Sequence, residues 1–166
     1  MRPSKGFTLI ELLVVISIIA LLSSIVISSL NAARDKARTA NARAELNQIA
    51  TAISLLITDT NRMPGGYGDP ALCDWPSGTN SIFLNASNAG LLTSHSSFSN
   101  WKGPYIRDVI DPWGQAYIYD SAYVCNGASN CGGYPNNVRA VHSGGPNNSG
   151  RDVYDTDNIV VVLCRA

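Results

Sequence analysis

Apolar residues fill one unbroken segment near the start of the chain, from Phe7 to Leu30, and Glu11 is the only charged residue inside it. As an α-helix that rises roughly 1.5 Å per residue, this segment would be about 36 Å long, whereas the hydrocarbon core of a bilayer is about 30 Å thick. The pattern therefore predicts a membrane-spanning helix over residues 7–30.

The helical pattern continues beyond this segment, but apolar residues now follow one face only. No proline or glycine occurs between Phe7 and Arg62, and Pro64 with the two glycines after it ends the pattern. The apolar positions recur at spacings of four and three: Ala42, Leu46, Ile49, Ile53 and Leu56. We expect an amphipathic helix over residues 31–60 whose apolar stripe packs against a folded domain.

Strand patterns occur only in the last part of the chain. Residues 116–119 and 138–142 show period-two alternation, and residues 159–163 are dense in β-branched side chains. Residues 64–99 are irregular, with a short helix expected near 88–92. The sequence predicts an α+β fold, in which a long N-terminal helical spine packs on a small three-stranded antiparallel sheet within a head formed by residues 61–166.

Charge and composition exclude several classes of protein. The chain has 12 basic and 12 acidic residues, so it has no general attraction for nucleic acid, and no nucleic-acid partner is expected. The segment Ser94-His95-Ser96 has no acidic residue close by in sequence, and the head contains neither a nucleophile elbow nor a nucleotide-binding loop. We therefore expect no catalytic residues and no enzymatic activity.

The four cysteines all lie in the distal part of the chain, where Gly, Asn, Ser, Pro and Tyr are also abundant. An even number of cysteines in an exported domain favours disulfides, and four cysteines allow three pairings. A zinc site is disfavoured because the chain has no C-x-x-C and only two histidines. A short, turn-rich loop separates Cys125 from Cys131 and favours a disulfide between these two residues. The remaining two cysteines then give the pair Cys73–Cys164.

The residues around the apolar segment separate three interpretations of it. Arg2 and Lys5 precede it, which favours a cytoplasmic N-terminus. A secretory signal peptide would have an apolar core of roughly 7–15 residues and a small-residue cleavage site, and this segment is longer. A plain membrane anchor does not explain Glu11, because a carboxylate inside a membrane helix is costly and requires a partner. Cleavage after Gly6 would create that partner, an α-amine four residues before Glu11.

The segment Lys5-Gly6-Phe7-Thr8-Leu9-Ile10-Glu11 closely resembles the type III signal sequence of type IV pilins and type II secretion pseudopilins. The resemblance implies that a prepilin peptidase cuts after Gly6 and methylates the new N-terminal Phe7. It also implies that Glu11 guides assembly. The carboxylate could meet the amine of its own chain or that of a neighbouring subunit, where it would set the stagger between subunits.

Two segments of the head resemble the major pseudopilins of type II secretion. The first comprises residues 101–105, Asp111-Pro-Trp-Gly114 and residues 117–119. The second comprises residues 143–147 and 155–157. In that family the second loop holds a calcium ion, and calcium takes oxygen ligands from carboxylates, amides and hydroxyls. The resemblance therefore implies a Ca²⁺ site at Ser143, Asn147, Asp152, Asp155 and Asp157, with Asn147 where the family has an aspartate.

Together these features imply a structural subunit of a type IV pilus-like or type II secretion pseudopilus filament. Four parts follow: a leader at 1–6, a membrane or filament-core helix at 7–30, an amphipathic helix at 31–60 and the head. The implied partners are other copies of the chain, the prepilin peptidase, an inner-membrane assembly platform and, before assembly, the membrane. The precursor would be a single-pass protein of the cytoplasmic membrane, and the filament periplasmic or extracellular. A minor pilin, a competence pseudopilin and a membrane-anchored extracellular binding module remain open alternatives.

Overall fold

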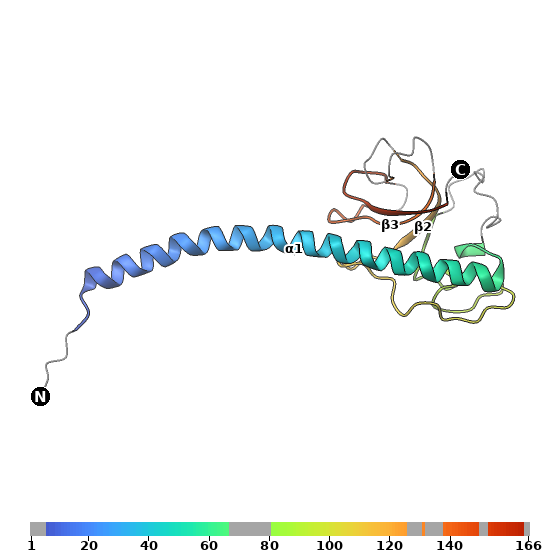
Figure 1. The fold of residues 1–166 in the computed structure, drawn as a ribbon, viewed down its shortest axis with the longest axis horizontal. Coiled ribbons are helices and arrows are strands. Elements are labelled where there is room, and N and C mark those ends of the chain that lie inside the picture. The colour runs from blue at the N-terminus through green and yellow to red at the C-terminus, as the bar shows by residue number, and fades with distance from the viewer. Residues whose placement is uncertain (1–5, 67–80, 126–130, 132–137, 150–152, 165–166) are drawn as a thin grey trace, which may run out of the picture. The chain divides into compact units, whose positions relative to one another are not determined.

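The computed structural model describes residues 6–66, 81–125, 131, 138–149 and 153–164. The chain divides into two compact units, residues 1–37 and 38–166. One long helix, α1 (Leu9–Thr60), belongs to both units (Figure 1). It confirms the predicted spine, and its end coincides with the expected break at Pro64, where a short 3-10 turn, η1 (Pro64–Gly66), follows.

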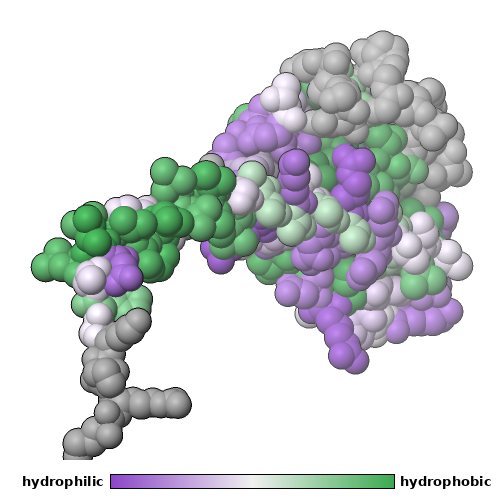
Figure 2. Space-filling view, turned by 60° about the vertical axis from the view of Figure 1, so that its left-hand side comes forward, coloured by the Kyte–Doolittle hydropathy of each residue, from purple (hydrophilic) through white to green (hydrophobic). Residues whose placement is uncertain are grey.

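The part of α1 in the first unit exposes its apolar side chains on every side. The large apolar residues from Leu9 to Leu30 are between 46% and 81% exposed. The most apolar window of α1 has a mean hydropathy of 2.8, and none of that window is buried inside the chain. Figure 2 shows the resulting hydrophobic surface. By length and composition this helix can cross a membrane, as the sequence predicts.

The second unit contains a four-stranded antiparallel sheet in the order β1-β2-β3-β4. Its strands are β1 (Ser81–Phe83), β2 (Ile118–Tyr123), β3 (Val138–Ser143) and β4 (Ile159–Cys164). The predicted strands at 138–142 and 159–163 are confirmed. The strand predicted at 116–119 begins at Ile118 instead, because Ala116 forms only an isolated bridge with Ile110. β1 was not predicted, and the short helix expected near 88–92 is a 3-10 turn, η2 (Ser87–Ala89).

The core of the second unit lies between α1 and one face of the sheet. All five residues of the predicted apolar stripe on α1 are fully or almost fully buried there. They pack with Tyr119 and Val141 of the sheet and with Tyr117, which immediately precedes β2. The stripe therefore positions the head on the spine, as its spacing predicts, and the α+β fold is confirmed.

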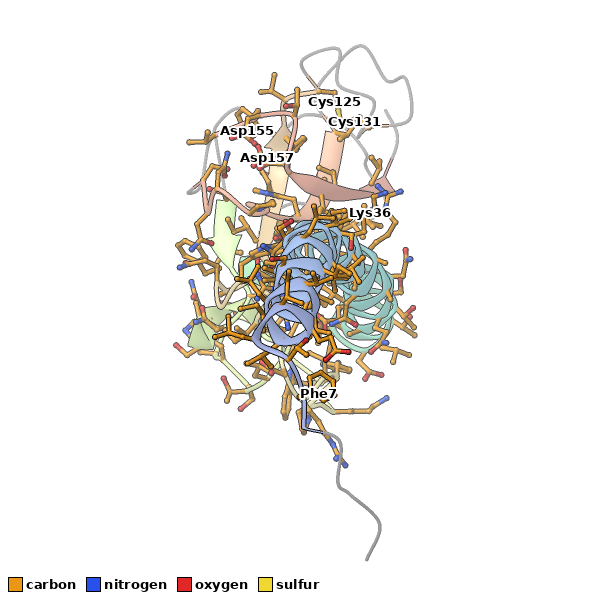
Figure 3. All side chains as sticks on the ribbon, turned by 90° about the vertical axis from the view of Figure 1, so that its left-hand side faces the viewer. Phe7, Lys36, Cys125, Cys131, Asp155 and Asp157 are labelled. Carbon is orange, nitrogen blue, oxygen red and sulfur yellow. A yellow bond between two sulfur atoms is a disulfide. The ribbon has the colours of Figure 1, made fainter. Side chains whose placement is uncertain are left out.

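A second, smaller core covers further sheet residues and contains a disulfide. Cys125 and Cys131 are bonded, which confirms the predicted pairing (Figure 3). They pack with Tyr123, Val138 and Val160, and Tyr154 adds its ring at 4.9 Å from that of Tyr123. Every residue of β2 and β3 is buried as a result. The other predicted pair, Cys73–Cys164, includes Cys73, which lies outside the described residues.

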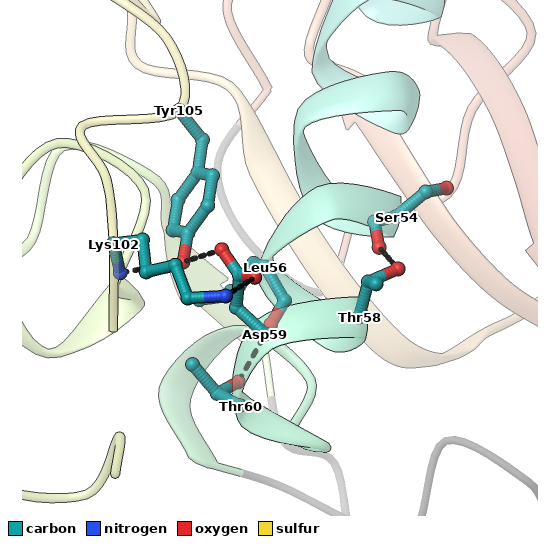
Figure 4. A network of polar contacts seen from close by, with 7 residues as sticks. All are labelled: Ser54, Leu56, Thr58, Asp59, Thr60, Lys102 and Tyr105. Carbon is teal, nitrogen blue, oxygen red and sulfur yellow. Dashed lines mark hydrogen bonds and ion pairs between the residues drawn. The ribbon is translucent and has the colours of Figure 1, made fainter. Parts of the chain in front are cut away.

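A polar network joins the end of α1 to the loop before β2 (Figure 4). The Asp59 carboxylate accepts hydrogen bonds from Lys102 Nζ at 2.9 Å and from the Tyr105 hydroxyl at 3.0 Å. These bonds hold the pKa of Asp59 below its ordinary value, and the carboxylate raises the pKa of Lys102. The network fixes residues 102–105 against the helix, in one of the segments that resemble major pseudopilins.

Candidate processing and assembly site

The peptide bond between Gly6 and Phe7 lies in a non-helical, exposed stretch immediately before α1. Residues 6–8 have no helical or strand structure, and the Phe7 side chain is 79% exposed. A Cβ added at Gly6 would meet no atom within 4 Å. The fold of this chain therefore places no steric requirement on a glycine at position 6, and the bond is accessible.

The side chain of Glu11 folds back onto the residue that begins the helix. Its Oε2 accepts hydrogen bonds from the Thr8 backbone N–H at 2.9 Å and from Thr8 Oγ1 at 2.8 Å. The Glu11 backbone N–H in turn donates to Thr8 Oγ1 at 3.3 Å. This reciprocal arrangement is a capping box, which satisfies N–H groups that the first turn of a helix leaves free.

In the capping box the Glu11 carboxylate is hydrogen-bonded to Thr8, the residue that follows Phe7. If the bond after Gly6 is cut, the new α-amine belongs to the residue next to the one that the carboxylate already binds. A carboxylate at the N-terminus of a helix also interacts favourably with the helix dipole. It is the Glu11 carboxylate, and not the helix dipole, that would attract the α-amine to the start of the helix. Thr8 was missed in the sequence, although the spacing T-x-x-E is the signal for it.

A second candidate site is the loop between β3 and β4, where the structure brings together three of the five predicted calcium ligands. Asn147 Nδ2 donates to Asp155 Oδ2 at 2.8 Å and to Asp157 Oδ1 at 2.9 Å. Gly145 makes this approach possible, because its φ of +68° is in the left-handed region and an added Cβ would strike the Asp157 carbonyl oxygen. Figure 3 labels the two aspartates.

The carboxylates of Asp155 and Asp157 are close enough that each affects the pKa of the other. Burial and the neighbouring Asp155 carboxylate raise the pKa of Asp157. Burial alone would raise the pKa of Asp155 as well, but hydrogen bonds, of which that from Asn147 is the strongest, lower it overall. Asp155 Oδ1 is buried and has no hydrogen-bond partner among the described residues. Two adjacent carboxylates with an unsatisfied buried oxygen fit a bound cation.

Of the other two predicted ligands, the structure describes only Ser143, and it does not join this group. Ser143 Oγ donates to Asp111 Oδ2 at 2.5 Å and accepts from the Gly145 N–H at 3.0 Å, so it holds the loop rather than facing the aspartates. Asp152 lies outside the described residues. Within the described part of the chain, no cluster of three His, Cys, Asp or Glu side chains could hold a metal. A metal site built from the described residues would need amide or backbone oxygens in addition to Asp155 and Asp157.

Sequence reasoning missed the residues that support this loop. Asp111 also accepts from the backbone N–H groups of Trp113 and Gln115, which stabilises the turn at residues 111–114. Asn158 Nδ2 donates to the Tyr123 hydroxyl, and the Tyr154 hydroxyl donates to Asp120. No local pattern predicts the contacts of Asp111 with Ser143, Asn158 with Tyr123 and Tyr154 with Asp120, because each joins residues more than 30 positions apart.

Comparisons with known proteins cover almost the whole spine and much of the head. Residues 1–27 match the family model described as the prokaryotic N-terminal methylation motif. Residues 29–129 match the model described as type II secretion system (T2SS), protein G. No solved structure gives a significant match.

Three characterised relatives are similar to the chain. The type II secretion system core protein G of Pseudomonas aeruginosa is 29% identical over 71% of this chain and 74% of its own length. The protein of the same description from Escherichia coli is 28% identical over 69% and 70%. The type IV wide pilus major component PilA4 of Thermus thermophilus is 46% identical, but over 37% of this chain and 47% of its own length.

Proposed function

The chain belongs to the type II secretion system protein G family, and we propose that it is the repeating subunit of a secretion pseudopilus, cut after Gly6 and polymerised through α1. A structural filament subunit is what the methylation motif and both kinds of relative support. The observation that favours the secretion filament is the match to the protein G model over residues 29–129, because it extends through most of the head.

The physical basis of assembly is the exposed apolar half of α1. Outside a bilayer, side chains such as Ile10, Ile16 and Leu22 would face water, and each is more than half exposed. Packing these helices together in a filament removes that surface from water, at roughly 25 cal/mol for each Å² of apolar area. Subunits that leave the membrane are thus stabilised only in the polymer.

A type IV pilus is the second candidate, and a specific observation favours it: the 46% identity with a wide pilus major component. That similarity covers a much shorter part of the chain than the protein G model does. Deleting the gene in its source organism separates the two functions. Loss of protein export with surface pili intact supports the pseudopilus, whereas loss of pili with export intact assigns the chain to a pilus.

Processing at Gly6 is the first prediction. We expect mass spectrometry of the assembled protein to show N-methylated Phe7 as the first residue. The Gly6→Leu variant should not be cleaved and should keep residues 1–6, because the peptidase requires a residue without a side chain at this position. A Cβ at position 6 contacts nothing among the described residues, so this loss would report recognition by the peptidase and not misfolding.

Ser4→Ala is the matched control within the leader and should be cleaved normally. A native protein that retains its first six residues, or begins at any residue other than Phe7, would contradict the proposal. The proposed partners follow from the same step: a prepilin peptidase and an inner-membrane platform act on a precursor whose N-terminus lies in the cytoplasm. The mature subunit then leaves for a periplasmic or extracellular filament.

We also propose that the carboxylates of Asp155 and Asp157 contribute ligands for Ca²⁺, and that the Asn147 side chain, whose Oδ1 here accepts from the Ser149 N–H, turns this oxygen to the ion when calcium binds. Bound calcium would offset the repulsion between the two carboxylates and stabilise the loop. A ligand at 100 times its Kd stabilises the folded state by about 2.7 kcal/mol. We therefore expect calcium to raise the Tm of the full chain by several degrees in differential scanning calorimetry.

Asp155→Asn/Asp157→Asn should abolish this calcium-dependent rise in Tm. Asp108→Asn, which alters an exposed carboxylate outside the loop, should leave it intact. Magnesium is the control for general screening of charge, because its preference for octahedral coordination makes it a poor substitute. An equal rise with magnesium, or no rise with calcium, would exclude a calcium site.

A further inference from the structure

Three basic side chains follow the apolar part of α1 within the next two turns of the helix. Arg34, Lys36 and Arg38 are all exposed, and the one acidic residue among them is Asp35. The segment 34–38, called the basic collar below, therefore has a formal net charge of +2. The methylation motif ends at residue 27, so nothing in that motif accounts for this concentration of charge.

The spacing along α1 places the collar at the level of the lipid headgroups when the apolar segment spans a bilayer. At roughly 1.5 Å per residue, Arg34, Lys36 and Arg38 lie about 6, 9 and 12 Å beyond Leu30 along the helix axis. Headgroups add roughly 5–8 Å to each side of the hydrocarbon core, and long basic side chains reach back toward that level. The charges thus stand where lipid phosphates are, and within about one Debye length of them.

Membrane topology does not explain the collar. Positively charged residues favour the cytoplasmic side, and Arg2 and Lys5 already mark that side at the other end of the apolar segment. The collar lies on the opposite side, where it weakens the asymmetry. Removal of residues 1–6 takes Arg2 and Lys5 away, so the collar becomes the nearest group of basic side chains to the membrane in the mature subunit.

We propose that the basic collar binds the headgroups of anionic phospholipids in the outer leaflet of the cytoplasmic membrane, and so retains processed subunits there until they assemble. The proposal rests on one part of the proposed function, the insertion of residues 7–30 in a bilayer. It does not depend on filament formation. Each basic residue close to an anionic membrane surface strengthens binding to that surface roughly fivefold, and the effect weakens as the salt concentration rises.

The test uses the full chain reconstituted into bilayers of phosphatidylcholine and phosphatidylglycerol in equimolar amounts. After extraction in mild detergent, lipid mass spectrometry measures the ratio of the two lipids that remain bound. We expect phosphatidylglycerol to be enriched at least about threefold over the mixture, since the net charge of the collar is two. High salt during extraction should remove the enrichment.

The variant Arg34→Gln/Lys36→Gln/Arg38→Gln should return the bound lipid to the composition of the mixture. The matched control, Arg43→Gln/Arg62→Gln/Arg107→Gln, removes the same charge from exposed positions farther along the chain and should keep the enrichment. Circular dichroism checks that both variants retain α1. The proposal is overturned if the wild-type chain shows no enrichment, if both variants lose it equally, or if the collar variant loses self-association while its bound lipid is unchanged.

Discussion

Replacing Glu11 with glutamine should leave the chain inserted in the membrane and cleaved after Gly6, but should lower filament assembly by at least about 100-fold. In the filament the carboxylate and the Phe7 amine would be buried among apolar helices. Removing one partner of a buried ion pair costs about 3–5 kcal/mol, and each 1.4 kcal/mol changes an equilibrium constant about tenfold. Electron microscopy and a sedimentation assay of sheared filaments measure the yield.

The control for this variant is Asp35→Asn, which makes the same change of charge a short distance beyond the apolar segment. It should assemble like the wild-type chain. Mass spectrometry of both variants establishes that processing is intact, so that a defect in assembly is not a defect in cleavage. If the Glu11→Gln variant formed filaments in normal yield, the proposed role of Glu11 in assembly would be contradicted. Unprocessed protein would instead assign Glu11 to recognition by the peptidase.

Truncating Leu56 to alanine should produce a large loss of stability. Leu56 is fully buried in the core between α1 and the sheet. Leucine-to-alanine changes in such positions cost about 2–5 kcal/mol, a large share of the 5–15 kcal/mol typical of folded domains. Urea unfolding of the purified chain, followed by tryptophan fluorescence, measures the change, because Trp101 and Trp113 pack against this core.

Leu55 provides an internal control one residue away on the same helix. Its side chain is 51% exposed, so Leu55→Ala removes the same atoms without opening a cavity. We expect a change of less than about 0.5 kcal/mol. Equal losses for the two variants would mean that the apolar stripe does not hold the head on the spine.

The spine could be predicted from the sequence because its signals are local and long. A run of apolar residues and a stripe at spacings of three and four both repeat over many turns, and Pro64 marks the end. The strands near the C-terminus were found for a similar reason, since β-branched residues are dense there. The disulfide Cys125–Cys131 followed from a short loop that brings its two ends together.

The features that escaped prediction depend on tertiary contacts. β1 has three residues, too few for a periodic pattern, and becomes a strand because β2 offers it an edge. Ser143 was grouped with the calcium ligands because its segment resembles the loop of major pseudopilins, yet its hydroxyl binds Asp111, 32 positions away. Asn147, Asp155 and Asp157 do meet, because Gly145 turns the chain sharply enough to bring them together.

The late start of α1 has a consequence for how the precursor meets its protease. Proteolytic active sites generally require several residues of substrate in an extended backbone conformation. A peptide bond inside a helix can therefore be cut only after the helix around it has unwound. Here the first helical residue is Leu9, so the bond after Gly6 needs no local melting. The cap that Thr8 and Glu11 form begins the helix after this bond, so the proposed cleavage would act on backbone that is already non-helical.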